Sequence, residues 1–129
     1  MKIKIINPNT CLDMTKSIEM VANEYAHANT NIVAVSPKRG PISIESYYDE
    51  ALATIGVMEE IVTSQTEMFD GYIIACFGDP GLSQAREITD TPVVGIAEAS
   101  MFMACMLGSR FSILSTVKRF EIPMLELIK

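Results

Sequence analysis

Cys76 is the residue best placed to do chemistry in this chain, because it directly follows the apolar run 72–75 and precedes a predicted helix. Open α/β sheets bind ligands at the carboxyl ends of their strands, and a helix N-terminus stabilises a thiolate. We expect Asp79 to cap that helix. A small apolar residue closing a buried strand is the alternative interpretation. Phe77 and the glycines on either side of Asp79 favour a site, since glycine lets a ligand approach the backbone.

The elements that must position this thiol alternate between strand-like and helix-like segments, which is the pattern of an α/β fold. We expect an open, mainly parallel sheet flanked by helices. The predicted strands cover 2–6, 31–35, 72–75, 92–96 and 110–114. The predicted helices cover 11–25, 47–68, 80–88, 97–107 and the segment from 117 onward. In the helix 47–68, periodicity places Tyr47, Ala51, Met58 and Val62 on the inner side.

Composition excludes several classes of protein. The 129 residues suit about one domain, and 10 basic against 16 acidic side chains give a net charge of −6 without a basic run, so we expect no nucleic-acid partner. No apolar segment reaches the roughly 18 to 20 residues of a membrane span. Three widely spaced cysteines suit reduced thiols and a cytoplasmic location, and their spacing predicts no metal site. The single histidine, His27, lies away from the strand ends, which argues against a Cys-His mechanism.

Several ordered motifs together resemble the amino-terminal half of hydantoin and allantoin racemases, within the aspartate/glutamate racemase superfamily. The resemblance spans essentially the whole chain. The matching segments are INPNT (6–10), GPISIE (40–45), IACFGDPGL (74–82), ARE (85–87), PVVGIAEA (92–99) and RFSI (110–113), continuing to Thr116.

The resemblance implies two similar α/β lobes with an active site between them and one catalytic cysteine from each lobe. Cys76 matches the first cysteine, and the division expected here is 1–96 for the first lobe and 97–129 for the start of a second, incomplete lobe. Cys11 and Cys105 do not occupy a strand-end loop of the kind that holds the second cysteine.

The implied reaction is racemisation at the ring carbon next to the carbonyl, with a thiolate base on one face and a thiol acid on the other, and without cofactor or metal. The residues implied to bind substrate are Asn9, Thr10, Ile44, Phe77, Gly78 and Thr116. Structural interpretations stay open for some of them: Asn9 or Thr10 as a helix cap, Ile44 as packing and Thr116 as a strand end. Arg39 and Arg86 suit either a carboxylate clamp or the solvated surface.

Three functions therefore remain. The first is a cofactor-independent racemase of 5-substituted hydantoins or allantoin, inactive if the chain lacks its second half. The second is a related decarboxylase or isomerase that needs one cysteine, and the third is a non-catalytic remnant or interaction domain. The apolar helix 97–107 and the final helix would expose a large apolar face, so we expect a homo-oligomer.

Overall fold

In the computed structural model, which describes residues 1–128, four strands form one parallel sheet in the order β2-β1-β3-β4. The strands are β1 (Lys2–Ile6), β2 (Asn31–Val35), β3 (Gly71–Ile74) and β4 (Val93–Gly95). Ile5 of β1 pairs with Ala34 of β2 on one side and with Ile73 of β3 on the other. The predicted parallel α/β sheet is confirmed, and β1 and β2 have the predicted bounds.

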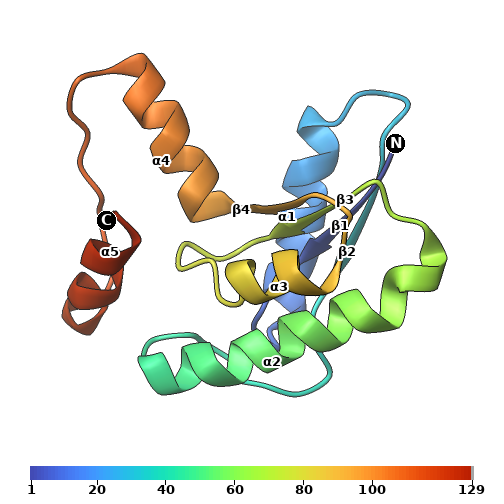
Figure 1. The fold of residues 1–129 in the computed structure, drawn as a ribbon, viewed down its shortest axis with the longest axis horizontal. Coiled ribbons are helices and arrows are strands. Elements are labelled where there is room, and N and C mark those ends of the chain that lie inside the picture. Colours follow the sequence, from blue (N-terminus) through green and yellow to red (C-terminus); the bar gives the residue numbers. More distant parts are fainter. Residues whose placement is uncertain (129) are drawn as a thin grey trace.

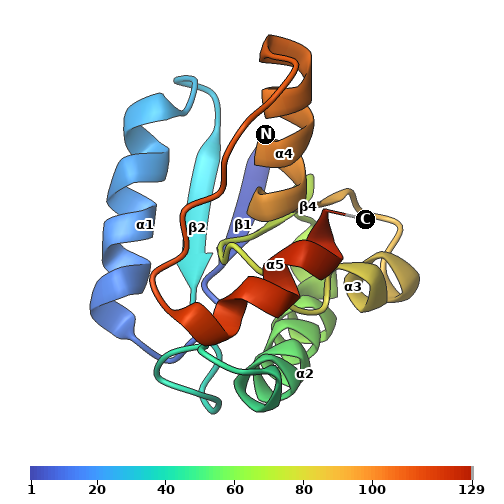
Figure 2. The same ribbon diagram turned by 90° about the vertical axis from the view of Figure 1, so that its left-hand side faces the viewer.

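Helices cover both faces of the sheet (Figures 1 and 2). Helix α1 (Leu12–Tyr25) lies on one face, whereas α2 (Tyr47–Ser64) and α3 (Leu82–Ile88) lie on the other. A 3-10 turn, η1 (Gln65–Glu67), follows α2. Right-handed crossovers require this arrangement, because the chain moves from β1 outward to β2 and then back past β1 to β3.

The core lies between the sheet and α2. It includes Ile6, Val57, Ile61 and Ile74, none of which is exposed to solvent. The inner face of α2 is formed by Ala53, Gly56, Val57, Ile61 and Ser64. The predicted inner face is wrong for Tyr47, Ala51 and Val62, which are exposed. It agrees with the structure for Met58, which is half-buried and packs against the core.

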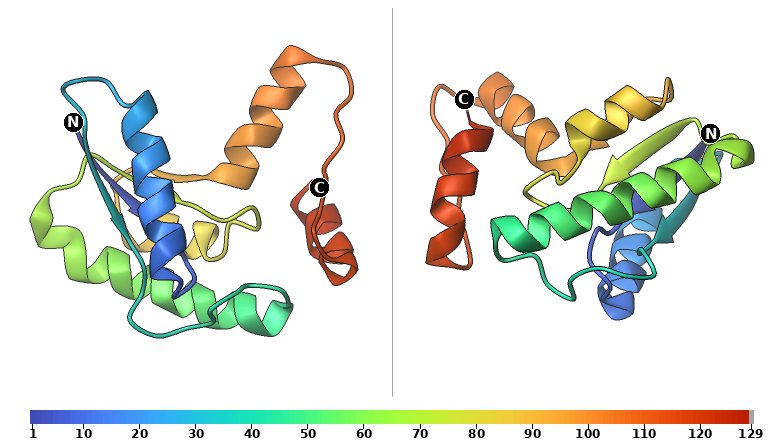
Figure 3. Two further views of the ribbon diagram at one scale, coloured as in Figure 1. Left: turned by 180° about the vertical axis from the view of Figure 1, so that it is seen from behind. Right: turned by 60° about the horizontal axis from the view of Figure 1, so that its bottom comes forward.

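The chain after β4 departs from the layered body (Figure 3). Helix α4 (Ile96–Leu107) leaves the sheet edge, and an extended segment then leads to the 3-10 turn η2 (Lys118–Phe120) and helix α5 (Glu121–Leu127). The predicted strand 110–114 is wrong, because this segment pairs with no strand among residues 1–128. None of the described helices has the length and apolar character needed to cross a membrane.

Candidate active site

Cys76 lies just beyond the carboxyl end of β3, which is one of the two central strands of the sheet. The N–H of Ala75 donates to the carbonyl of Ile6 at 2.8 Å, so β3 and β1 stay paired up to the point where the two segments leave the sheet. From there β1 leads to α1 on one face and β3 leads to α3 on the other. A divergence of this kind opens the crevice in which α/β sheets bind ligands.

A cavity of about 260 Å³ lies next to Cys76. Its walls come from the loop before α2, the loop after β3, the extended segment and the last helix: Ser43, Ile44, Glu45, Cys76, Phe77, Leu114, Ser115, Thr116, Val117, Phe120 and Met124. The structure thus brings four predicted site residues to one cavity from three distant segments: Cys76, Ile44, Phe77 and Thr116. The volume is slightly below the range of about 300–1,000 Å³ typical of pockets for drug-sized ligands.

The other three predicted site residues lie outside the walls of this cavity. Asn9 is buried, and its Oδ1 accepts from the N–H of Cys11 at 2.9 Å, just before α1. Thr10 donates its hydroxyl and its N–H to the carbonyl of Pro41, at 3.3 and 3.0 Å. Gly78 packs near the ring of Phe120 and lines two neighbouring cavities.

Burial dominates the electrostatics of the thiol. Desolvation raises the pKa of Cys76 to about 11 from an ordinary 9.0. The backbone N–H of Gly78 lowers the pKa of the thiol, whereas the nearby carboxylates of Asp79 and Glu50 raise it further. The expected stabilisation of a thiolate is therefore wrong for this structure, because α3 begins well beyond Cys76, at Leu82.

Asp79 also caps a different helix from the one predicted. Helix α3 begins after Gly81, which occupies the N-cap position in a left-handed conformation with φ of 77°. The carboxylate of Asp79 instead accepts from the N–H groups of Ala97 and Glu98, at the start of α4.

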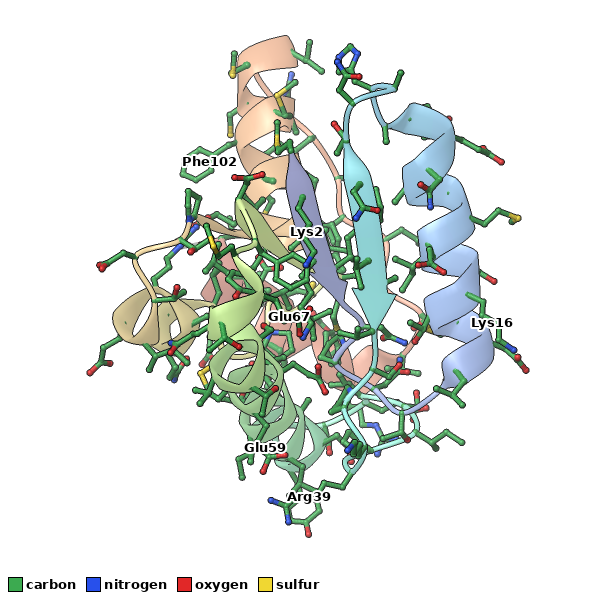
Figure 4. All side chains as sticks on the ribbon, turned by 90° about the vertical axis from the view of Figure 1, so that its right-hand side faces the viewer. Lys2, Lys16, Arg39, Glu59, Glu67 and Phe102 are labelled. Carbon is green, nitrogen blue, oxygen red and sulfur yellow. The ribbon has the colours of Figure 1, made fainter. Side chains whose placement is uncertain are left out.

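Both arginines that were candidates for a substrate clamp are engaged by acidic side chains of the chain itself. Arg39 pairs with Glu59 of α2, as the labelled side chains in Figure 4 show, and Arg86 pairs with Glu98 of α4. Arg119 lies closer to the cavity and binds Glu45 at 2.6 Å. This ion pair joins the loop before α2 to the turn before α5, and sequence reasoning missed it because the two residues are far apart in the chain.

Phe120 and Met124 are further wall residues that the sequence did not single out. The spacing of these two apolar residues indicates that one side of the last helical segment packs against the rest of the chain. It does not indicate which residues that side contacts. A larger cavity of about 870 Å³ lies among α4, the extended segment and α5, and Cys105 lines it. Within residues 1–128 no cluster of His, Cys, Asp and Glu side chains is arranged to hold a metal ion.

Comparison with known proteins gives concordant results. The family model described as Asp/Glu/Hydantoin racemase matches residues 3–127. The chain is 56% identical over 128 residues to a hydantoin racemase of Pseudomonas sp. (strain NS671), covering 99% of this chain and 51% of that protein. It is 43% identical over 130 residues to a hydantoin racemase of Paenarthrobacter aurescens, covering 100% of this chain and 55% of that protein.

A solved structure agrees as well. The allantoin racemase from Klebsiella pneumoniae superposes with a TM-score of 0.96 at 48% identity, covering 99% of this chain and 52% of that one. The chain spans about half the length of the relatives it matches. The family match over nearly all its residues, together with the fold, shows that this chain belongs to the Asp/Glu/hydantoin racemase family.

Proposed function

We propose that the chain takes part in the cofactor-independent racemisation of 5-substituted hydantoins or allantoin, with Cys76 as its proton-transfer group. The observation that carries the proposal is that Cys76 lies beyond β3, at the divergence of β1 and β3, and lines a cavity with Ile44 and Thr116. The relatives named above are racemases of these two small ring compounds. A cavity of about 260 Å³, slightly below the range for drug-sized ligands, supports substrates that are smaller than such ligands.

The proposed reaction begins when a thiolate removes the proton from the ring carbon that lies between a ring nitrogen and the carbonyl. The electron pair of the broken C–H bond moves to the carbonyl oxygen and leaves a planar enolate. An acid on the opposite face then donates a proton to the same carbon and inverts it. Because burial raises the pKa of Cys76, this residue is a thiol at neutral pH and is ready to act as the acid.

Substrate contacts are assigned by the same proposal. Ile44, Phe77 and Thr116 line the cavity beside Cys76 and would contact the ring. Gly78 would shape the loop around Cys76, whose thiol its backbone N–H contacts. Asn9 and Thr10 would act from the adjoining loop after β1, where their hydrogen bonds hold the chain against Pro41 and Cys11.

The second proton-transfer group must come from elsewhere. Cys76 is the one cysteine lining this cavity in the described part of the chain. The proposal keeps residues 1–96 as a first lobe and 97–129 as the start of a second one. It also includes self-association, because Phe102, Met103, Met106 and Leu107 of α4 are each more than half exposed.

Self-association and location are tested separately from the chemistry. Sedimentation velocity of the chain should show a dimer or larger species. A Met106→Glu substitution on α4 should shift the distribution of species toward the monomer. A monomer at all accessible concentrations would refute this part of the proposal. A cytoplasmic location, in which the three free cysteines stay reduced, also belongs to the proposal and can be tested by cell fractionation.

A related decarboxylase or isomerase that needs one cysteine is the second candidate, because in the described part of the chain a single cysteine lines the cavity. A lone thiol exchanges the ring proton with solvent on one face and returns it to the same face. Such an enzyme incorporates deuterium from D₂O without loss of optical activity. A racemase incorporates deuterium and loses optical activity together.

The deciding experiment follows enantiopure allantoin and a 5-substituted hydantoin in D₂O by polarimetry and mass spectrometry. Cys76→Ala should abolish both signals, whereas Cys105→Ser, which changes an exposed thiol outside this cavity, should keep them. Loss of rotation that depends on Cys76 supports the racemase, and exchange without loss of rotation supports the one-cysteine reaction. Neither signal above background from a folded sample refutes both activities for this chain.

A further inference from the structure

Asp79 connects the loop that carries Cys76 to the start of α4. Its side chain is buried, with 6% exposed. One carboxylate oxygen accepts from the N–H of Ala97 at 3.0 Å, and the other accepts from the N–H of Glu98 at 2.7 Å. The first N–H groups of a helix have no partner within the helix, so this carboxylate satisfies two of them.

The backbone of Asp79 is tied to Cys76 as well. Its N–H donates to the carbonyl of Cys76 at 3.0 Å, and its carbonyl accepts from the N–H of Leu82 at 3.1 Å. Asp79 has a φ of 46°, in the left-handed region that is uncommon for residues other than glycine, although Asp adopts it more readily than most. A carboxylate anchored to α4 therefore holds the turn 76–79 in a conformation that its backbone alone does not favour.

Gly95, at the end of β4, leaves just enough room for this carboxylate. A Cβ built on Gly95 would lie 2.2 Å from Cγ of Asp79 and 2.4 Å from its Oδ2. Any other residue at position 95 would push the carboxylate out of its place. Gly71 in β3 offers a contrast, because a Cβ there would meet nothing closer than the carbonyl oxygen of Pro92, at 3.8 Å.

We propose that Asp79 is a positioning residue that keeps Cys76 in its half-buried place by anchoring the turn 76–79 to the first N–H groups of α4. The inference rests on the proposed role of Cys76 in proton transfer. It also means that a displacement of α4 would reach the turn that carries the thiol through Asp79.

Charged groups of four helices, α2 to α5, act on this arrangement. The carboxylates of Asp79 and of Glu50, which lies on α2, raise the pKa of Cys76. Burial and the carboxylate of Glu126 on α5 raise the pKa of Glu50. Arg86 of α3 and Glu98 of α4 pair with each other next to Asp79. Release of the turn would expose the half-buried Cys76 further to water and reduce the desolvation that is the largest cause of its raised pKa.

The test compares Gly95→Ala, Asp79→Asn and the control Gly71→Ala in the complete 129-residue chain. Iodoacetamide alkylation of Cys76 is followed from pH 6 to 12 by peptide mass spectrometry. In Gly95→Ala, which keeps the charge of Asp79 but displaces it, the midpoint should fall from about 11 toward 9.0. That shift raises the alkylation rate at pH 8 by up to about a hundredfold. Asp79→Asn loses one of its two acceptor oxygens and also a charge that raises the pKa of Cys76, so it should shift in the same direction for both reasons. Gly71→Ala should behave as the unaltered chain.

Two outcomes would overturn the inference. One is an unchanged Cys76 profile in both Gly95→Ala and Asp79→Asn. The other is a parallel rise in the alkylation of Cys11, which lies on a different loop and reports general loosening. If Gly95→Ala fails to fold, Asp79→Glu takes its place, because it keeps the charge and displaces the carboxylate by one methylene. Asp79→Asn cannot take that place, since it also removes a charge that raises the pKa of Cys76. Alkylation needs no substrate, so a shifted profile in a chain that does not racemise supports Asp79 and counts against the racemase alone.

Discussion

Asn7 offers a sharp test of how the loop after β1 is held in place. Its side chain is buried, with 1% exposed. Its Nδ2 donates to Oδ1 of Asn9 at 2.9 Å and to Oγ1 of Thr15 at 3.0 Å. These bonds connect the end of β1 to α1 across the loop that holds Asn9 and Thr10.

The expected cost of Asn7→Ala follows from these contacts. Each lost hydrogen bond contributes about 1 kcal/mol net to stability. Oδ1 of Asn9 keeps the N–H of Cys11, and Oγ1 of Thr15 keeps the carbonyl of Cys11, so neither is left without a partner. With the small void added, the unfolding free energy should fall by about 2–3 kcal/mol. Asn7→Asp should cost more, because a buried carboxylate would face the acceptor oxygen of Asn9.

The measurement is urea unfolding followed by far-UV circular dichroism. With a slope of about 1–3 kcal/mol per molar urea, Asn7→Ala should lower the midpoint by about 1 M or more. Asn23→Ala is the matched control, because Asn23 is exposed on α1 and donates only to the carbonyl of Glu19. A cost of Asn7→Ala below about 0.5 kcal/mol, or no larger cost for Asn7→Asp, would refute the reasoning.

Three further predictions concern the thiol, a buried ion pair and a close helix contact. Because the pKa of Cys76 is raised from 9.0 to about 11, its thiolate fraction below pH 9 is about a hundredfold lower, and alkylation at pH 8 should be slower than that of a model cysteine peptide by this factor. The folded state also holds this proton more tightly, so the unfolding free energy should decrease between pH 9 and pH 11, and a flat dependence would contradict the assignment. Lys4→Met leaves the carboxylate of Glu60 without its buried partner at 3.0 Å and should cost about 3 kcal/mol in urea unfolding. Adding Glu60→Gln should recover part of that loss, and a double variant no more stable than the single one would count against it. Gly56→Ala brings a Cβ to 2.8 Å from Cβ of Pro37 and should lower Tm by several degrees, whereas an unchanged Tm would show that the loop gives way.

The strands could be predicted from the sequence because their signal is local. Runs of β-branched and apolar residues between turn residues are sufficient to predict a strand, and 2–6 and 31–35 agree with the structure at both ends. The same signal failed at 110–114. A strand also needs a neighbouring edge with which to pair, and Leu114 there is 98% exposed.

The face of α2 shows a second limit. Apolar periodicity selected Tyr47 and Val62, both of which are exposed, whereas Gly56 and Ser64 are buried. Small and polar residues face inward here because the helix lies close to its neighbours. Gly56 meets Pro37, and the hydroxyl of Ser64 lies 3.3 Å from that of Tyr72.

The candidate site divides in the same way. Cys76 could be singled out because the end of a strand and the start of a loop are both written in local residue types. Its grouping with Ile44, Phe77 and Thr116 in one cavity followed from the resemblance, since no local pattern connects positions so far apart. Asn9 and Thr10 match the family motif equally well, yet the structure turns their side chains to Cys11 and Pro41.

The sequence by itself determined the alternation of strands and helices, the family and the position of Cys76 at the end of a strand, because local residue types and ordered motifs carry that information. Only the tertiary structure decided which helix Asp79 caps, which residues surround the cavity and in which direction the pKa of Cys76 moves. Each of these depends on desolvation and contacts between segments distant in the chain, and those arise only when the chain is folded.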